Sequence, residues 1–198
     1  MAADPAGPTP IERGLDDAIA LSTWLRDLER ASGVITRLAD HLAACLKAGG
    51  RILTCGNGGS LCDAMHLAEE LSGRFRDDRP ALAAQAMADP SHLTCVANDC
   101  GFERVFARGV EAWGKAGDAL VVFSTSGKSP NLIAAVETAR ARGLSVVGLL
   151  GRDGGPLRGA CDHVIVVPGA TSDRIQEVHI KIVHLLIELI ESRLFGTA

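Results

Sequence analysis

Two pairs of polar side chains are spaced so that each pair can act from one face of a helix. His66 and Glu70 are four residues apart, and residues at that spacing are neighbours on a helix surface. Gln176 and His184 are eight residues apart, which leaves them within about a quarter turn of each other. Two imidazoles, a carboxylate and an amide oxygen would suit a divalent, zinc-like ion. Taken singly, each residue is a weak signal, because a lone histidine on an amphipathic helix is more often a hydrogen-bonded structural side chain.

His179 is a poorer candidate ligand, although it belongs to the same segment as His184. Five residues separate the two histidines, and on a helix that spacing turns their side chains about 140° apart. We therefore expect that they do not share one ion.

A glycine-rich loop directly precedes the segment that carries His66. Residues 56–60 read Gly-Asn-Gly-Gly-Ser, in which glycines let the backbone approach a ligand and the side chains of Asn57 and Ser60 offer hydrogen bonds. A dinucleotide fingerprint would need glycine where Leu61 stands, so NAD is not expected. The structural alternative is a tight turn capped by Ser60.

A second loop, residues 124–129, is rich in hydroxyl groups and runs into an expected helix. It contains Ser124, Thr125, Ser126 and Ser129. Four hydroxyls exceed what one helix cap uses, and the free amides and dipole at a helix N-terminus favour an anion. A nucleotide P-loop is excluded because Val122 stands where that motif needs glycine. The loop therefore predicts a cradle for one phosphate group.

Acidic residues at three other places are ambiguous from spacing alone. Asn98 and Asp99 could form a turn that ends a helix, where both residue types are common. Asp173 could cap the last helix. The pair at residues 77–78 is typical of a solvated loop, and we assign it no role.

The candidate residues need a scaffold of alternating strands and helices. We expect strands at residues 51–55, 84–87, 118–123, 145–150 and 163–167, and helices at 61–75, 102–113, 130–142 and 173–194, after two helices between 11 and 48. Short apolar strands followed by helices indicate a parallel sheet covered on both faces. The predicted fold class is therefore α/β, a three-layer, doubly wound (flavodoxin-like) parallel sheet. In such folds ligands bind beyond the carboxyl ends of strands, where both loops fall.

Composition restricts the class of protein further. The 198 residues, 47% hydrophobic and 22% charged, suit a single domain over residues 11–198 behind a flexible tail at 1–10. A net charge of −4 and only seven aromatic residues, two Trp and five Phe, argue against nucleic acid as a partner. We expect no membrane span and no secretory signal. Six cysteines without a C-x-x-C pair favour a reducing cytoplasm.

From about Leu21 onward the motifs resemble the bacterial phosphoheptose isomerase family, which has the sugar isomerase (SIS) fold. The matching segments are residues 56–70, 91–99, 124–129 and 173–177, together with His184. The resemblance implies an aldose–ketose isomerase that converts D-sedoheptulose 7-phosphate to D-glycero-D-manno-heptose 7-phosphate, the first step of heptose biosynthesis for lipopolysaccharide core or related glycans. It also implies one zinc per subunit and a homotetramer in which the N-terminal helices pack.

The same resemblance implies roles for individual residues. The implied zinc ligands are His66, Glu70, Gln176 and His184. The implied substrate contacts are Asn57, Gly58, Gly59, Ser60, Arg74, Asn98, Asp99, Ser124, Thr125, Ser126, Ser129 and Gln176. An enediol route needs a base and an acid, which we assign to Glu70 and His184, with Asp99 or Asp173 assisting in ring opening. A tight metal ligand is not readily a free acid or base, so the two roles of Glu70 and His184 compete.

Two other functions fit the same loops. A non-catalytic tetramer of this fold that associates with the replication initiator protein could share both of them. So could an isomerase or binding protein for another phosphosugar, because the loops read phosphate and hydroxyls generically. The joint presence of all four proposed ligands with Asp99 and Asp173 favours the enzyme.

Overall fold

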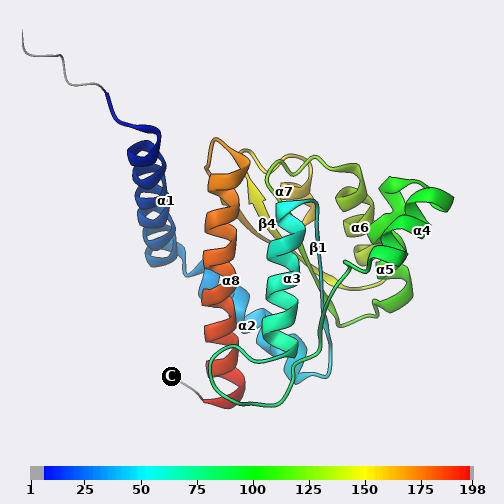
Figure 1. The fold of residues 1–198 in the computed structure, drawn as a ribbon. Helices are drawn as coiled ribbons and strands as arrows, with labels where there is room; N and C mark the ends of the chain where they lie inside the picture. Colours follow the sequence, from blue (N-terminus) through cyan, green and yellow to red (C-terminus); the bar gives the residue numbers. More distant parts are fainter. Residues whose placement is uncertain (1–6, 197–198) are drawn as a thin grey trace, which may run out of the picture.

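A five-stranded parallel sheet is the scaffold of the computed structural model, which describes residues 7–196 (Figure 1). The strands are β1 (Ile52–Gly56), β2 (Ala84–Ala86), β3 (Ala119–Ser124), β4 (Ser145–Gly151) and β5 (His163–Val167). All neighbours pair in parallel, in the order β2-β1-β3-β4-β5. This is the flavodoxin-like doubly wound order, so the predicted fold class is confirmed.

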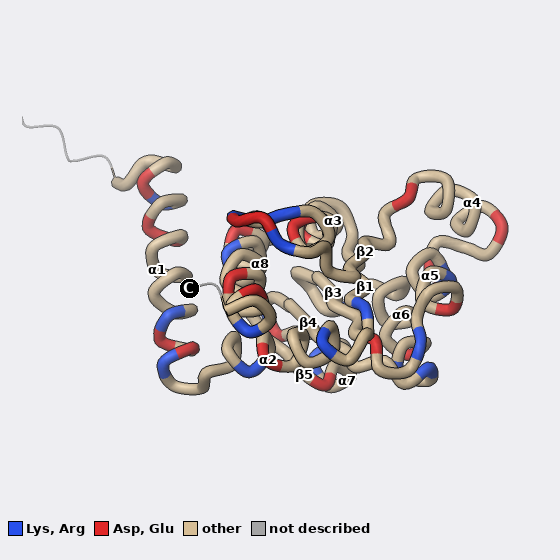
Figure 2. Tube along the Cα trace, turned by 90° about the horizontal axis from the view of Figure 1, so that it is seen from below, with Lys and Arg blue, Asp and Glu red and all other residues tan. Residues whose placement is uncertain are grey.

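Helices cover both faces of the sheet. They are α1 (Pro10–Ser32), α2 (Val34–Lys47), α3 (Gly59–Ser72), α4 (Pro90–Cys100), α5 (Val105–Trp113), α6 (Pro130–Ala141), α7 (Leu157–Ala160) and α8 (Ser172–Phe195), with a 3-10 turn at Phe102–Arg104. Helices α2, α3 and α8 pack on one face, and α5 and α6 pack on the other (Figures 1 and 2). The two apolar layers hold the sheet between them.

Strand β3 shows why the sequence forms a doubly covered sheet. All six of its residues are buried, and successive side chains in a strand point to opposite faces. Val121 and Phe123 join the apolar cluster under α2, α3 and α8, whereas Leu120 and Val122 join the one under α5 and α6. A continuous apolar run is therefore needed here, rather than an alternating pattern.

Helix α4 is the main element that the sequence analysis missed. Asp89 caps it by accepting a hydrogen bond from the backbone N–H of His92 at 2.8 Å, and Pro90 occupies its first turn. Val96 is its buried residue, so the segment lacks the apolar stripe by which helices are recognised. The short helix α7 was missed as well, and α3 ends at Ser72 rather than at Phe75.

The N-terminal helix α1 lies at one end of the molecule, beside α8 (Figures 1 and 2). Lys181 of α8 donates to Ser22 Oγ at 2.6 Å, and Leu25 is buried in the core. It begins with a capping box, in which Thr9 accepts from the N–H of Glu12 and donates its own N–H to the Glu12 carboxylate. Residues 1–6 of the predicted tail lie outside the described residues, and α1 starts at Pro10. Within residues 7–196, no helix is long and apolar enough to span a bilayer.

Candidate active site

The two predicted ligand loops lie side by side at the carboxyl edge of the sheet. They follow β1 and β3, which are neighbours in the sheet, with Gly56 opposite Phe123. The helix after β1, α3, covers one face and the helix after β3, α6, covers the other. The connections after β1 and β3 therefore run to opposite faces of the sheet. In doubly wound folds, ligands bind in the crevice between two such connections.

Close packing explains the glycines of the first loop. Gly58 has φ +56°, a conformation that favours glycine. A Cβ at Gly59 would lie 2.7 Å from the side-chain oxygen of Gln176, so a larger residue here would displace the Gln176 amide from its present position. The amide of Asn57 exchanges two hydrogen bonds, of 3.0 and 2.8 Å, with that of Asn131 on α6. Asn131 is buried, and the sequence analysis did not single it out.

The hydroxyl loop is folded by its own side chains. Ser124 Oγ accepts from the N–H of Gly127 at 2.9 Å, and Ser126 Oγ accepts from the N–H of Lys128 at 3.3 Å. Thr125 Oγ1 lies 3.0 Å from the hydroxyl of Ser172 on α8. Ser129 is the N-cap of α6, where its side chain makes no capping hydrogen bond within the described chain. The Ser129 hydroxyl is therefore not used in capping at the N-terminus of α6, a position that favours an anion such as phosphate.

Three of the four predicted metal ligands meet between α3 and α8. The Nε2 atoms of His66 and His184 are 3.0 Å apart, and His66 Nε2 is 3.4 Å from Glu70 Oε1. Ligand atoms of a tetrahedral zinc ion lie about 3.3 Å apart, given bond lengths of about 2.0 to 2.2 Å. These separations fit a metal ion, and we call the three residues the His–Glu–His group.

The surroundings of this group are partly open. The side chain of His66 is 37% exposed, whereas that of Glu70 is only 16% exposed. The ring of Phe75, from the loop after α3, stacks on His184 with a centroid distance of 5.9 Å. One side of the group is therefore shielded by an aromatic ring while His66 stays accessible to solvent.

Asp63 is a buried carboxylate on α3 that the sequence analysis missed. Its Oδ2 atom has no hydrogen-bond partner among the described residues. Burial raises the pKa of the Asp63 carboxyl to about 6, against an opposing effect of His66. The sequence did hold a signal for it, because Asp63 is an acidic residue on the apolar side of the helix that follows the glycine loop. A carboxylate one turn from a ligand histidine can orient or polarise it.

Gln176, the fourth predicted ligand, lies beside the glycine loop. Its Nε2 donates to Ser60 Oγ at 3.3 Å, and its amide approaches Gly59 closely. The structure therefore places Gln176 of α8 against Ser60 in the first turn of α3, and a metal-ligand role for Gln176 stays a prediction. His179 lies instead in the core, with Nε2 donating to the backbone oxygen of Leu150 at 3.1 Å, and it takes no part in the His–Glu–His group.

Other predicted site residues lie apart from this group within one chain. Asn98 and Asp99 are exposed at the carboxyl end of α4, which lies on the far side of α5 from α3 and α8 (Figures 1 and 2). Arg74 is exposed directly before Phe75. Asp173 is exposed in the first turn of α8, whose N-cap is Thr171. A hydrogen bond from Thr171 lowers the pKa of the Asp173 carboxyl.

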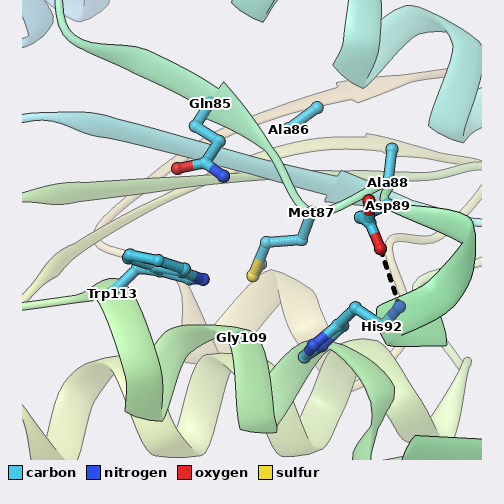
Figure 3. Close-up of a pocket in the computed structure, with 8 residues that line it drawn as sticks. All are labelled: Gln85, Ala86, Met87, Ala88, Asp89, His92, Gly109 and Trp113. Carbon is cyan, nitrogen blue, oxygen red and sulfur yellow. Dashed lines mark hydrogen bonds between the residues drawn. The ribbon is translucent and has the colours of Figure 1, made fainter. Parts of the chain in front are cut away.

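A cavity of about 270 Å³ lies elsewhere, between the edge strand β2 and α5 (Figure 3). Gln85, Met87 and Trp113 point toward it, and Asp89 and His92 close its other end. None of the predicted site residues lines this cavity, so it is separate from the ligand loops and from the His–Glu–His group.

The comparisons with known proteins agree with the fold. A family model described as SIS domain matches residues 18–151, so the molecule is a SIS-domain protein. Phosphoheptose isomerase from Fusobacterium nucleatum is 56% identical over 159 residues, which cover 80% of this chain and 82% of that protein. The one from Tolumonas auensis is 52% identical and covers 88% and 91%. The chain therefore belongs to the phosphoheptose isomerase family, as its motifs predicted, and it is an isomerase.

Solved structures lead to the same family. Phosphoheptose isomerase from Neisseria gonorrhoeae superposes with a TM-score of 0.85 at 38% identity, over 92% of this chain and 97% of that one. The enzyme from Francisella tularensis gives a TM-score of 0.84 at 35% identity, over 92% and 96%. The fold matches theirs across nearly the whole length of both chains.

Proposed function

We propose that this protein converts D-sedoheptulose 7-phosphate to D-glycero-D-manno-heptose 7-phosphate through an enediol, as the first step of heptose biosynthesis. The observation that carries the proposal is the joint placement of the His–Glu–His group and the two ligand loops along α3 and α8. Family membership at 52–56% identity supports the same reaction.

The distance between the two parts of the site suits a long phosphosugar. His66 follows Gly59 by seven residues on α3, which corresponds to about 10 Å along the helix axis. An extended seven-carbon chain with a terminal phosphate has a comparable length. The loop at residues 124–129 lies beside the glycine loop, so a substrate with its phosphate there can run past the glycine loop and bring its carbonyl carbons to the His–Glu–His group.

We propose one zinc ion per subunit, held by His66, Glu70, His184 and Gln176. The donor set of two imidazoles and a carboxylate is typical of zinc. When bound, the ion supplies positive charge that polarises the substrate carbonyl and stabilises the enediolate.

The protein's own groups would move the protons. Glu70 takes the proton from one carbon and returns it to the adjacent carbon, while His184 serves the oxygens as the acid. Both are also proposed ligands, so each must leave the ion during proton transfer or hold it loosely. Asp99 and Asp173 would assist ring opening, and the amides and hydroxyls at residues 124–129 bind the phosphate.

An isomerase assay on metal-stripped protein, with and without added zinc, tests the proposal. We expect zinc-dependent conversion of sedoheptulose 7-phosphate and much weaker conversion of shorter phosphosugars. Preference for another phosphosugar would reassign the substrate. Folded protein that binds phosphosugar tightly without converting it would favour the non-catalytic tetramer that associates with a replication initiator.

We further propose a homotetramer that acts in the cytoplasm. Three large apolar residues, Ile11, Leu15 and Ile19, are 75%, 60% and 65% exposed on one side of α1, and such a stripe typically marks an interface. Six free cysteines support a reducing compartment. Neither nucleic acid nor membrane is a proposed partner.

A further inference from the structure

Arg79 is a buried cation in the loop that leads from α3 to β2, outside the proposed catalytic machinery. Its side chain is only 4% exposed, and its Nε donates to Glu191 Oε1 at 2.7 Å, where the Glu191 side chain is 8% exposed. Removing two charges from water is costly unless hydrogen bonds satisfy the remaining donors. The partners of the remaining Arg79 donors therefore show what this buried ion pair holds in place.

Those donors close the carboxyl end of α3. Arg79 Nη2 donates to the backbone oxygen of Glu70 at 2.6 Å, and Nη1 donates to those of Leu71 and Gly73 at 2.8 and 3.0 Å. Nη1 also lies 3.2 Å from the oxygen of Pro80. The last carbonyls of a helix have no partner within the helix, and a cation beside them is favourable. Arg79 thus binds the backbone of the residue whose side chain is the proposed base.

The other end of the contact reaches the second helix of the site. Glu191 lies on α8, seven residues after His184, and that spacing brings the two to the same face of the helix. One guanidinium therefore connects the backbone of Glu70 on α3 with the helix that carries His184. Phe75, which stacks on His184, lies between Gly73 and Arg79, in the loop that the hydrogen bond from Arg79 to the Gly73 oxygen closes.

We propose that Arg79 is a positioning residue that sets the Glu70 carboxylate relative to His184, through the carbonyls of α3 and the carboxylate of Glu191. The inference rests on the roles proposed above for Glu70 and His184. The glycine loop and the hydroxyl loop lie at the opposite end of both helices. Arg79 therefore controls the geometry of the His–Glu–His group and the proton transfer, rather than the binding of the phosphosugar.

Arg79→Lys is the test variant, since lysine keeps the charge but lacks the planar fork of donors. We expect kcat to fall at least about tenfold with KM within about twofold, because small misplacements of catalytic groups are costly. We also expect Co²⁺ to bind at least about tenfold more weakly, with an altered absorption spectrum. The matched control is Arg193→Lys, since Arg193 pairs with Asp40 from the exposed surface of α8, and it should leave all three readouts unchanged.

Failure of the positioning role and failure of the proposed reaction give different results. A lower melting temperature with unchanged kcat and Co²⁺ affinity would show that Arg79 is merely structural and overturn the inference. If the wild-type protein lacks isomerase activity, the proposed reaction fails, and Co²⁺ affinity and spectrum still decide the positioning role. Should Arg79→Lys not fold, Glu191→Gln provides the same readouts, because it weakens the anchor and leaves the α3 carbonyls bound. A Glu191→Gln protein with wild-type kcat and Co²⁺ spectrum would count against the proposal.

Discussion

At the scale of single residues, α3 carries two carboxylates with different surroundings. Glu70 is part of the His–Glu–His group, whereas Asp63 is buried with one oxygen unpartnered among the described residues. The types and spacing of His66 and Glu70 were sufficient to predict that they share a face. The position of Asp63 on the apolar side of α3 could be inferred from the sequence, but its unpartnered oxygen could not, because that depends on how α3 docks against the sheet and α8.

Glu70→Gln tests the proposed base. The amide cannot accept the substrate proton, so we expect kcat to fall by about 10²-fold to 10⁴-fold. Binding of the phosphosugar should be retained, because the phosphate is bound by residues 124–129 and not by Glu70. Steady-state kinetics and calorimetric titration with substrate measure the two effects, and wild-type turnover in this variant would exclude Glu70 as the base.

Asp63→Asn tests the buried carboxylate through the pH dependence of stability. Burial raises the pKa of Asp63 to about 6 from an ordinary value of 3.8. The folded state therefore holds a proton that the unfolded state has lost between these values, and wild-type stability decreases as pH rises through about 6. Asparagine does not carry this charge, so metal-free Asp63→Asn should melt at a higher temperature than wild type at pH 7.5. The difference should shrink near pH 4; an equal difference at both pH values would contradict the assignment.

At the scale of elements, predictability follows burial. Strands β1, β3, β4 and β5 were predicted because each is a short apolar run, and β3 is buried along its whole length. The edge strand β2, Ala-Gln-Ala, is the exception, since it is short and only partly buried. Helix α4 was not, since Val96 is its buried residue and the rest of the segment is largely exposed. The two ligand loops were identified because glycines and clustered hydroxyls signal their chemistry directly. Their partners, such as Asn131 opposite Asn57, depend on the pairing of β1 with β3.

Ser126→Ala tests the hydroxyl loop as a phosphate site. The phosphate is bound equally in the ground state and the transition state, so losing one hydroxyl should raise KM more than it lowers kcat. The variant removes the 3.3 Å hydrogen bond from the N–H of Lys128 to Ser126 but keeps the 2.9 Å bond from the N–H of Gly127 to Ser124, so we expect the loop to keep most of its shape. Kinetics with sedoheptulose 7-phosphate and competition by inorganic phosphate provide the readout. A change confined to kcat would remove Ser126 from the phosphate site.

At the scale of the whole molecule, the predicted site residues are not all brought together within one chain. Asn98 and Asp99 lie on α4, away from α3 and α8 (Figures 1 and 2), and α1 leaves a stripe of large apolar side chains exposed. Sequence motifs predicted that these residues belong to one function but not where one chain would place them. Distances between segments are set by packing, which a linear motif does not encode.

The exposed stripe on α1 gives the prediction at this scale. Leu15 is 60% exposed between Ile11 and Ile19, so Leu15→Glu should have little effect on the fold of one chain and should be costly in an interface. By light scattering after size exclusion, we expect wild type to have four times the chain mass of 20.7 kDa and Leu15→Glu to form smaller species. The control Arg13→Glu changes a residue about 160° away around the same helix and should keep the tetramer. A monomeric wild type, or an intact Leu15→Glu tetramer, would show that the stripe on α1 does not join the subunits.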